Sequence, residues 1–271
     1  MTQAMGGTGT IRRMVGAVTV AVAATALLGG CGPADGADGT ANAPATPATS
    51  PKDALLATVP QGTEGAFRFT GRDASSTLSG RVDPAAKAFE MVTLMPADSD
   101  GVTTKLSFLV IDDELWLKAK FTGRPGLPKF PDKWMKLDRS RLKDAASAPS
   151  YDGADLGNAG PLIQAATSVQ EQAPGRYAGV IDVTEGEAAK ALEDGEAAAL
   201  GEAGRQVPFT AVVGPDRHLT SLTLKMPAAG KRKAYDYVVS YVDYGTAPKI
   251  TRPGGSTATK APAAAYDLLN G

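Results

Sequence analysis

Hydrophobic and polar positions alternate along most of the chain between residues 66 and 244, which is typical of strands with one buried face. In residues 66–71, Phe67 and Phe69 fall on one side of an extended chain, and Arg68 and Thr70 fall on the other. Comparable runs predict further strands at residues 76–82, 88–95, 103–111, 114–121, 133–138, 176–183, 206–213, 218–226 and 233–244. Short turns join many of these runs, so neighbouring strands are expected to pair antiparallel.

Helical spacing predicts three helices beside these strands. A short helix is expected at residues 53–59. Residues 160–172 predict a second helix, because apolar side chains recur at helical intervals at Leu162, Ile163, Ala166 and Val169. The Ala- and Glu-rich residues 185–203 predict a third helix, which three internal glycines weaken. One antiparallel sheet with inserted helices gives the fold class α+β, in a single domain over residues 52–253.

The first 30 residues have the layout of an export signal. Arg12 and Arg13 precede an uncharged run of 15 residues, shorter than the roughly 20 that a membrane-spanning helix needs. The run leads into Leu28-Gly29-Gly30-Cys31, which contains the only cysteine of the chain. This string resembles the bacterial lipobox, which implies that the thiol of Cys31 receives a diacylglycerol and that residues 1–30 are removed as a signal peptide. An ordinary secretion signal with a chance cysteine and a buried free thiol are the alternatives.

Both ends of the remaining chain are of low complexity. Of the 20 residues 32–51, 17 are Ala, Pro, Gly, Thr or Ser, and none has a large apolar side chain. Residues 31–51 are therefore predicted to be a flexible tether that spans about 25 Å after the lipidated cysteine. Residues 254–271 form a second low-complexity tail. It is expected either to fray or to dock Tyr266, Leu268 and Leu269 on the domain or on a partner.

The charge of the chain argues against electrostatic partners. The 28 Lys and Arg residues face 29 Asp and Glu residues, a net charge of -1, so no nucleic-acid partner is expected. Cleavage before Cys31 removes two arginines and no acid, which leaves 26 basic and 29 acidic residues and a charge of -3. Acyl chains on Cys31, rather than electrostatic attraction, are then expected to anchor the exported protein to the outer face of the cell membrane.

Few residues suit catalysis or metal binding. One Cys and one His are too few for a thiolate zinc site, a disulfide framework or an iron–sulfur cluster. His218 lies in a predicted turn, and no Gly-x-Ser-x-Gly string is present, so we expect neither an enzyme nor a cofactor. Residues 98–101 resemble a calcium loop only superficially and are interpreted as a turn. Two of the adjacent carboxylates Asp112, Asp113 and Glu114 could act as acid and base, but this segment is also interpreted as a turn.

Two further features allow either packing or binding. The basic residues 129–136 and Lys231-Arg232-Lys233 either contact anionic lipid and wall polymers or keep strand ends soluble. The last predicted strand is apolar on two faces, with Tyr235, Tyr237, Val239 and Tyr241 on one and Val238, Val242 and Tyr244 on the other. Such a strand is expected to be covered on both faces, by helices on one side and by core packing or a bound apolar ligand on the other.

After the lipobox and a short helix, several hydrophobic strings follow in order. They are Phe67-Arg68-Phe69, Glu114-Leu115-Trp116-Leu117-Lys118, Lys133-Trp134-Met135-Lys136-Leu137-Asp138, residues 175–183 and Tyr241-Val242-Asp243-Tyr244-Gly245-Thr246. Together these strings resemble the actinobacterial LppX/LprAFG family of exported lipoproteins, which is related in shape to the lipoprotein carriers LolA and LolB. The resemblance covers about residues 52–253 and rests on loose hydrophobic strings.

Membership of this family would imply a strongly curved antiparallel half-barrel with helices packed in its concave face, around an apolar cavity for acyl chains. The candidate cavity residues are Phe67, Phe69, Met91, Leu106, Phe108, Leu115, Leu117, Leu162, Ile163 and Val169. The implied function is the binding of lipid or lipoglycan acyl chains by a carrier or chaperone of the cell envelope. The competing hypothesis is a lipid-anchored interaction or sensing module that has the same fold and no lipid cargo.

Overall fold

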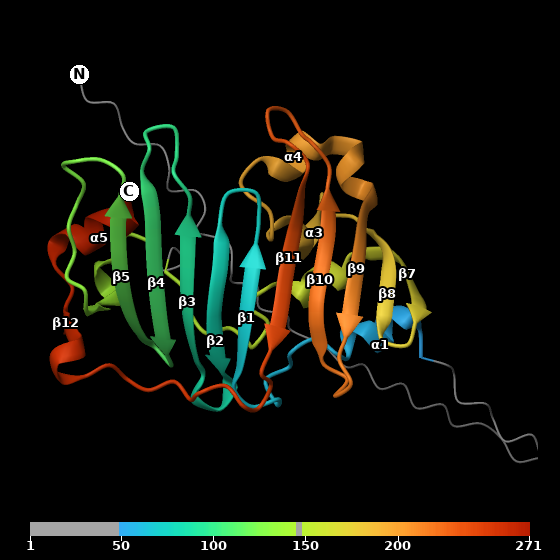
Figure 1. The fold of residues 1–271 in the computed structure, drawn as a ribbon, viewed down its shortest axis with the longest axis horizontal. Helices are drawn as coiled ribbons and strands as arrows, with labels where there is room; N and C mark the ends of the chain where they lie inside the picture. The colour runs from blue at the N-terminus through green and yellow to red at the C-terminus, as the bar shows by residue number, and fades with distance from the viewer. Residues whose placement is uncertain (1–48, 145–147) are drawn as a thin grey trace, which may run out of the picture.

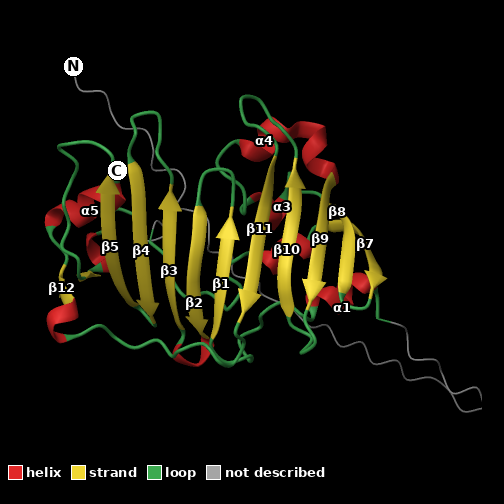
Figure 2. Cartoon of the chain, viewed as in Figure 1, coloured by secondary structure: helices red, strands yellow, loops and turns green. Residues whose placement is uncertain are grey.

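A computed structural model describes residues 49–144 and 148–271, and a single curved, unclosed sheet of twelve strands dominates it (Figures 1 and 2). The strands lie in the order β12-β6-β5-β4-β3-β2-β1-β11-β10-β9-β8-β7. Their bounds are β1 Phe67–Arg72, β2 Thr77–Asp83, β3 Ala88–Met95, β4 Thr103–Ile111, β5 Glu114–Thr122, β6 Trp134–Leu137, β7 Ala166–Ala173, β8 Arg176–Ile181, β9 Val207–Val213, β10 Leu219–Met226, β11 Tyr235–Val242 and β12 Ala258–Lys260. The helices are α1 Pro51–Leu56, α2 Ala159–Gln164, α3 Gly186–Ala189, α4 Glu196–Leu200 and α5 Ala263–Asn270. The predicted α+β class is confirmed.

Strand pairing is antiparallel except at one edge, where β12 lies parallel to β6. The sheet is therefore mixed, and the expectation of a purely antiparallel sheet is wrong. The exception arises because β12 comes from the C-terminal segment, which reaches β6 by a long connection instead of a hairpin. In the middle of the sheet β1 pairs with both β2 and β11, so the first and the last long strands join the two halves of the sheet.

Alternating side chains give the sheet two faces, which we call the covered face and the open face. On the covered face, Phe67 and Phe69 of β1 lie directly opposite Val82 and Gly80 of β2. The helices lie behind this face in Figure 1, and their apolar side chains join the same buried cluster. On the open face, the other side of the same strand, the side chain of Arg68 is exposed. The hydrophobic effect thus places the main core on one side of the sheet only.

The predicted helix at residues 160–172 is wrong in its second half. Leu162 and Ile163 lie on α2, but α2 ends at Gln164, and the following residues form the edge strand β7. Val169 therefore lies on a strand and is half-buried. The physical reason is that β7 forms backbone hydrogen bonds with β8. These bonds stabilise the extended conformation more than four apolar residues at helical spacing stabilise a helix.

The predicted helix at residues 185–203 is broken. It consists of α3, α4 and a 3-10 turn at Gly201–Gln206. Gly195 and Gly201 have φ angles of 78° and 52°, in the left-handed region that interrupts a helix. Two of the glycines that weakened the prediction therefore bound α4, Gly195 at its N-cap and Gly201 at its C-cap, whereas Gly186 lies at the start of α3.

The C-terminal segment is folded. The prediction that it docks on the domain is therefore confirmed, and the alternative of a frayed end is wrong. The connection from β11 crosses one end of the sheet, where Ile250 is buried against Leu109 and Trp116 of the open face (Figure 1). β12 and α5 follow, and Tyr266 on α5 is 3% exposed. Most of residues 254–271 therefore belongs to the domain and is not a separate tail.

The expected signal peptide, Cys31 and nearly all of the tether lie outside the described residues. The described part begins just before α1, whose N-cap is Ser50; the hydroxyl of Ser50 accepts a hydrogen bond from Asp53 N at 3.1 Å. In residues 49–144 and 148–271, none of the helices has the length and apolar character that crossing a membrane requires.

Candidate functional site

The ten predicted cavity residues lie in one layer between the covered face and the helices. Nine of them are at most 6% exposed and belong to one hydrophobic cluster. They come from four strands and one helix, namely Phe67, Phe69, Met91, Leu106, Phe108, Leu115 and Leu117 on β1, β3, β4 and β5, and Leu162 and Ile163 on α2. Val169 packs against the margin of the cluster from the edge strand β7. The sequence pattern thus identified the apolar layer, with Val169 at its border.

Tyrosines of β11 attach the covering segments to the sheet by hydrogen bonds. Tyr235 donates to Glu196 Oε1 at 2.7 Å on α4, and Tyr237 donates to Gly157 O at 3.3 Å. The hydroxyl of Tyr241 donates to Asp155. Each ring lies in the apolar layer while its hydroxyl bonds to the cover, which is how a buried tyrosine avoids an unsatisfied polar group.

Asp155 is the polar centre of the cover over β11. Its carboxylate accepts hydrogen bonds from Ala159 N at 3.2 Å and Gly160 N at 2.7 Å, at the start of α2, and from Tyr241. Burial raises the pKa of Asp155, while the hydrogen bonds from Tyr241 and the backbone act in the opposite direction. Burial and the charge of Asp155 raise the pKa of Tyr241. The pair is therefore structural, because Asp155 fixes the position of α2.

The cover approaches the sheet most closely at Gly157. A Cβ atom at this position would overlap the side chains of Val239 and Tyr241, so the close approach requires glycine. Leu156, next to it, is 7% exposed. The cover and the sheet are thus in direct contact at Gly157.

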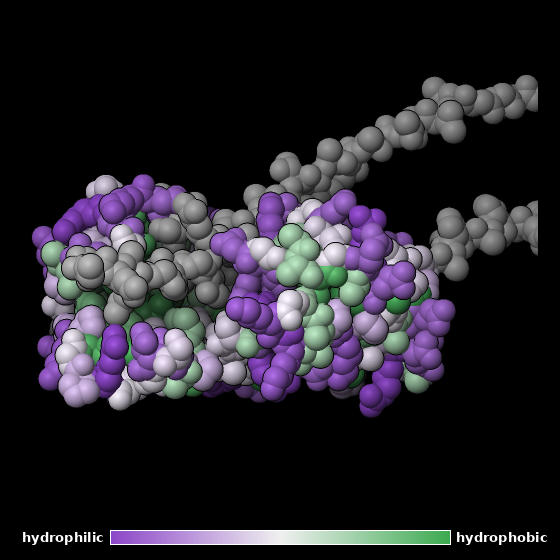
Figure 3. All heavy atoms as spheres, turned by 90° about the horizontal axis from the view of Figure 1, so that it is seen from above, coloured by the Kyte–Doolittle hydropathy of each residue, from purple (hydrophilic) through white to green (hydrophobic). Residues whose placement is uncertain are grey.

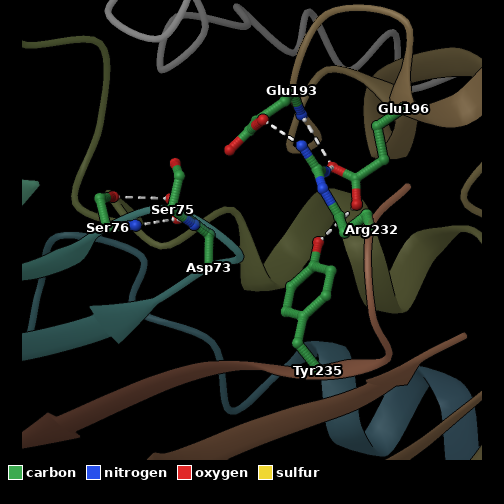
Figure 4. A network of polar contacts seen from close by, with 7 residues as sticks. All are labelled: Asp73, Ser75, Ser76, Glu193, Glu196, Arg232 and Tyr235. Atoms are coloured by element: carbon green, nitrogen blue, oxygen red, sulfur yellow. Dashed lines mark hydrogen bonds and ion pairs between the residues drawn. The ribbon is translucent and has the colours of Figure 1, made fainter. Parts of the chain in front are cut away.

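A polar network connects the β10–β11 hairpin to the segment between α3 and α4 (Figure 4). Arg232 forms ion pairs with Glu193 and with Glu196, the latter at 2.7 Å between Nη1 and Oε2. Burial acts to lower the pKa of Arg232, but the hydrogen bonds and charges of the two glutamates outweigh it and raise that pKa. Burial, and then the hydrogen bond to Glu196, raises the pKa of Tyr235. The network thus gives Glu196, which is 5% exposed, both an ion pair with Arg232 and a hydrogen bond from Tyr235.

A small cavity of about 60 Å³ lies between this network and the sheet. Apolar side chains, among them Phe69, Leu156 and Val239, line it together with polar groups at its mouth, including Asp73 and Glu193. Asp73 accepts hydrogen bonds from the backbone and hydroxyls of neighbouring serines, as Figure 4 shows. A volume of this size holds only a few water molecules. Of the ten predicted residues, only Phe69 lines the cavity.

The half of the molecule built on β2–β6 differs. Figure 3 looks onto one end of the sheet, and in this half hydrophobic atoms are visible between the polar residues of the rim. The covered face of this half carries Met91, Leu106, Phe108 and Leu117, all at most 6% exposed. Tyr266 on α5 accepts a hydrogen bond from Asp138 N at 2.9 Å. In this half the described cover of the apolar layer includes α5.

The remaining candidates from the sequence have structural roles. His218 stacks on Tyr244 with ring centroids 4.6 Å apart. Asp98 accepts hydrogen bonds from the backbone of its own turn, and Glu114 is bound by Lys136 and Arg252. In the described part of the chain no group of three His, Cys, Asp or Glu side chains could hold a metal ion.

Sequence reasoning missed the polar partners of the β11 tyrosines. The row of tyrosines on this strand is visible in the sequence, but no motif marks Asp155, Glu193 and Glu196 as their partners. These three residues are far from the tyrosines along the chain. The expectation that β11 is covered on both faces is wrong, since Val242 on the open face is 47% exposed. Serine and threonine side chains on the neighbouring strands make that face polar enough to be in contact with water.

Comparison with known proteins adds little. No family model and no curated protein matches the sequence. Among solved structures, one described as "Crystal structure of fusion DH domain" is 13% identical, covers 74% of this chain and 73% of its own length, and has a TM-score of 0.21. A TM-score this low supports no argument about fold or function.

Proposed function

We propose that this chain is an exported lipoprotein, anchored through a diacylglycerol on Cys31, that binds the acyl chains of a lipid or lipoglycan as a carrier of the cell envelope. In this proposal the curved sheet acts as a half-barrel with helices in its concave face, as in the LppX/LprAFG family. The observation that supports the proposal is the apolar layer between the sheet and its cover, to which nine of the ten predicted cavity residues belong.

Burial of acyl chains supplies the driving force. Each methylene group removed from water contributes about 0.8 kcal/mol. The cavity of about 60 Å³ near Glu193 is too small for an acyl chain, so in this proposal the chains enter the apolar layer behind β2–β6. Lipid binding therefore requires no change in the tightly bonded cover over β11.

A second candidate function has support from the other half of the molecule. Under β7–β11 the interior is filled by side chains, and the cover is attached by Asp155, Glu196 and Arg232. A filled interior favours a lipid-anchored interaction or sensing module without lipid cargo. The two functions differ in whether the apolar layer behind β2–β6 takes up a ligand.

Lipid extraction separates the two functions. The full chain is purified from membranes in mild detergent and extracted with organic solvent, and the extract is analysed by mass spectrometry. Acyl chains attached covalently to Cys31 stay with the protein, so the extract reports only bound lipid. A carrier yields one lipid class in near-stoichiometric amount, above the level of an unrelated lipoprotein purified in the same way. Lipid at the level of that control would establish the interaction module.

Anchoring is tested independently of cargo. Replacement Cys31→Ser removes the acceptor thiol, and we expect it to abolish incorporation of a palmitate analogue. Unchanged incorporation would exclude lipidation at this position. The control is Ser50→Ala, which alters a hydroxyl near the start of the domain and leaves the lipobox intact.

A further inference from the structure

A basic cleft lies on the open face of the sheet, on the side opposite the apolar layer. Residues 103–136 contain seven Lys or Arg and four Asp or Glu, whereas the whole chain has a net charge of -1. Several of these lysines line a cleft of about 540 Å³ over β3, β4 and β5. Its lining includes Lys105, Lys118, Lys120, Ser107, Phe130 and Trp134. Positive charge is therefore concentrated in one concave place.

Two of the lysines face each other without a counter-charge. Lys105 on β4 is directly opposite Lys120 on β5, with both side chains on the open face. Neither forms an ion pair within the residues that the structure describes. Like charges directly opposite each other on neighbouring strands destabilise a sheet. An anion between the two ammonium groups would remove this repulsion.

The neighbouring row supplies a fixed cation and a hydroxyl. Lys118 on β5 lies opposite Ser107 on β4, and its ammonium group is 4.9 Å from the centre of the Trp134 ring. Ser107 is 8% exposed, and its hydroxyl forms no hydrogen bond with a described residue. The floor of the cleft thus offers a free donor between the lysines.

The outer wall of the cleft exists because β6 is short. β6 pairs with β5 only at residues 115–117 of β5, so the C-terminal end of β5 has a neighbouring strand only on the side of β4. The segment with Phe130 and Asp132 takes that place, and the ring of Phe130 is 6.1 Å from that of Phe121. Of the two acidic side chains in the lining, Glu90 is bound by Arg81 at 2.8 Å, and Asp132 is exposed at the rim.

We propose that this cleft binds a phosphate group of a ligand. Three ammonium groups and one hydroxyl match a multiply charged anion with several acceptor oxygens, whereas a single carboxylate would leave most of that charge uncompensated. The phosphate belongs either to a soluble phosphorylated compound or to the head group of a lipid. The inference is independent of the proposed acyl-chain function, because the cleft and the apolar layer lie on opposite faces of the sheet.

Titration calorimetry of the full chain in one uncharged detergent tests the cleft. The probes are inorganic pyrophosphate for the soluble source, dihexanoylphosphatidic acid, whose phosphate is a monoester, for the lipid source and acetate as a single-carboxylate control. We expect saturable binding of one or both phosphate compounds, and the compound that binds more tightly identifies the source. Absence of binding by both, or equal affinity for acetate, overturns the proposal.

Variants locate the binding. The double replacement Lys105→Gln with Lys120→Gln is expected to weaken phosphate binding about tenfold or more. The matched control is Lys231→Gln with Lys233→Gln, which removes two exposed lysines from the β10–β11 hairpin and should leave affinity unchanged. Asp132→Asn removes the acid at the rim and is expected to tighten binding. Equal losses in both double variants would mean that the binding is nonspecific.

The first double variant also has a readout without ligand. Removing the opposed charges should raise the midpoint of thermal unfolding at low salt, and added salt should reduce that gain because it screens the repulsion. A lower midpoint at low salt would show that the two lysines stabilise the sheet without an anion between them. That result would overturn the proposal.

Discussion

The two halves of the sheet carry covers of different kinds. Behind β7–β11 lie α1, α3 and α4, and the side chains of Asp155, Glu196 and Arg232 attach the cover to the sheet (Figure 1). Behind β2–β6 the labelled helix is α5, and contacts of its buried Tyr266 with the apolar layer hold it in place (Figure 1).

The difference shows how one sheet can combine a rigid part and a receptive part. Buried polar partners fix the relative position of two layers, because any displacement leaves a donor or acceptor unsatisfied. Apolar contacts impose no such direction, so a layer held by them can accept a ligand of similar character. Experiments that disturb each half separately can therefore test the comparison.

The largest expected effect is at α5. Tyr266→Ala removes a side chain that is 3% exposed, its hydrogen bond with Asp138 N and its contact with Arg141, whose guanidinium lies 3.8 Å from the ring centre. We expect a loss of about 4 kcal/mol in the free energy of unfolding, measured by urea denaturation. Hydrogen exchange should increase in β5 and β6 and stay unchanged in β8 and β9. A uniform increase would contradict the independence of the two halves.

A somewhat smaller effect is expected at the polar centre of the other half. Asp155→Ala leaves the donors at Ala159, Gly160 and Tyr241 without their acceptor, which should cost about 3 kcal/mol. Denaturation curves check this value, with Asp152→Ala as the control, since Asp152 is exposed and accepts a hydrogen bond from the hydroxyl of Ser150. If both variants lose the same stability, Asp155 does not hold the cover.

Two buried alanines compare the space available in the two halves. Ala211→Leu on β9 overpacks the filled half and should cost about 2 kcal/mol, whereas Ala119→Leu on β5 should cost less than about 1 kcal/mol. The same Ala119 variant should reduce the amount of co-purified lipid, which quantitative mass spectrometry measures. Equal costs would mean that the half with β5 is packed as tightly as the half with β9.

The smallest effect concerns an ion-pair cluster on the open face. Hydrogen bonds from Lys136 and Arg252 lower the pKa of Glu114. A lowered pKa in the folded state stabilises the protein above the pKa of the unfolded chain, and this contribution disappears as the pH falls through the folded value. Both cations are more than half exposed, so Glu114→Gln should cost only about 0.5 kcal/mol.

This loss at Glu114 should be present at pH 7 and absent near pH 3, as urea midpoints at the two pH values would show. Glu202→Gln, at a side chain that is 88% exposed, is the control and should change neither midpoint. A loss that persists at pH 3 would mean that packing of the side chain, and not its charge, is responsible.

Much of the sheet could be predicted because alternation is local. Phe67 and Phe69 share a face whatever lies elsewhere in the chain, since a strand directs alternate side chains to opposite sides. The helix boundaries could not be predicted in this way. Ala166 and Val169 fit a helix by spacing, but the free edge of β8 supplied hydrogen-bond partners that made the segment a strand.

The same distinction between local patterns and contacts of distant segments applies to the candidate site. Nine of the ten predicted residues proved to be buried in the apolar layer, because hydrophobicity marks core residues wherever they meet. Asp155 and Glu196 escaped prediction, because a polar residue becomes a structural partner only through a contact with a distant strand. The lysine pair of the cleft was likewise invisible in sequence, since Lys105 and Lys120 meet through the register of β4 and β5.

The sequence by itself determined the alternation that buries one face of each strand, the glycines that end helices, and the string at Cys31 on which the anchoring proposal rests. These features depend on neighbours within a few residues. Only the tertiary structure decided that β12 runs parallel to β6, that α5 completes the domain and that lysines of two strands share a cleft. Those outcomes depend on contacts between distant segments, whose free energies are not encoded in any local pattern.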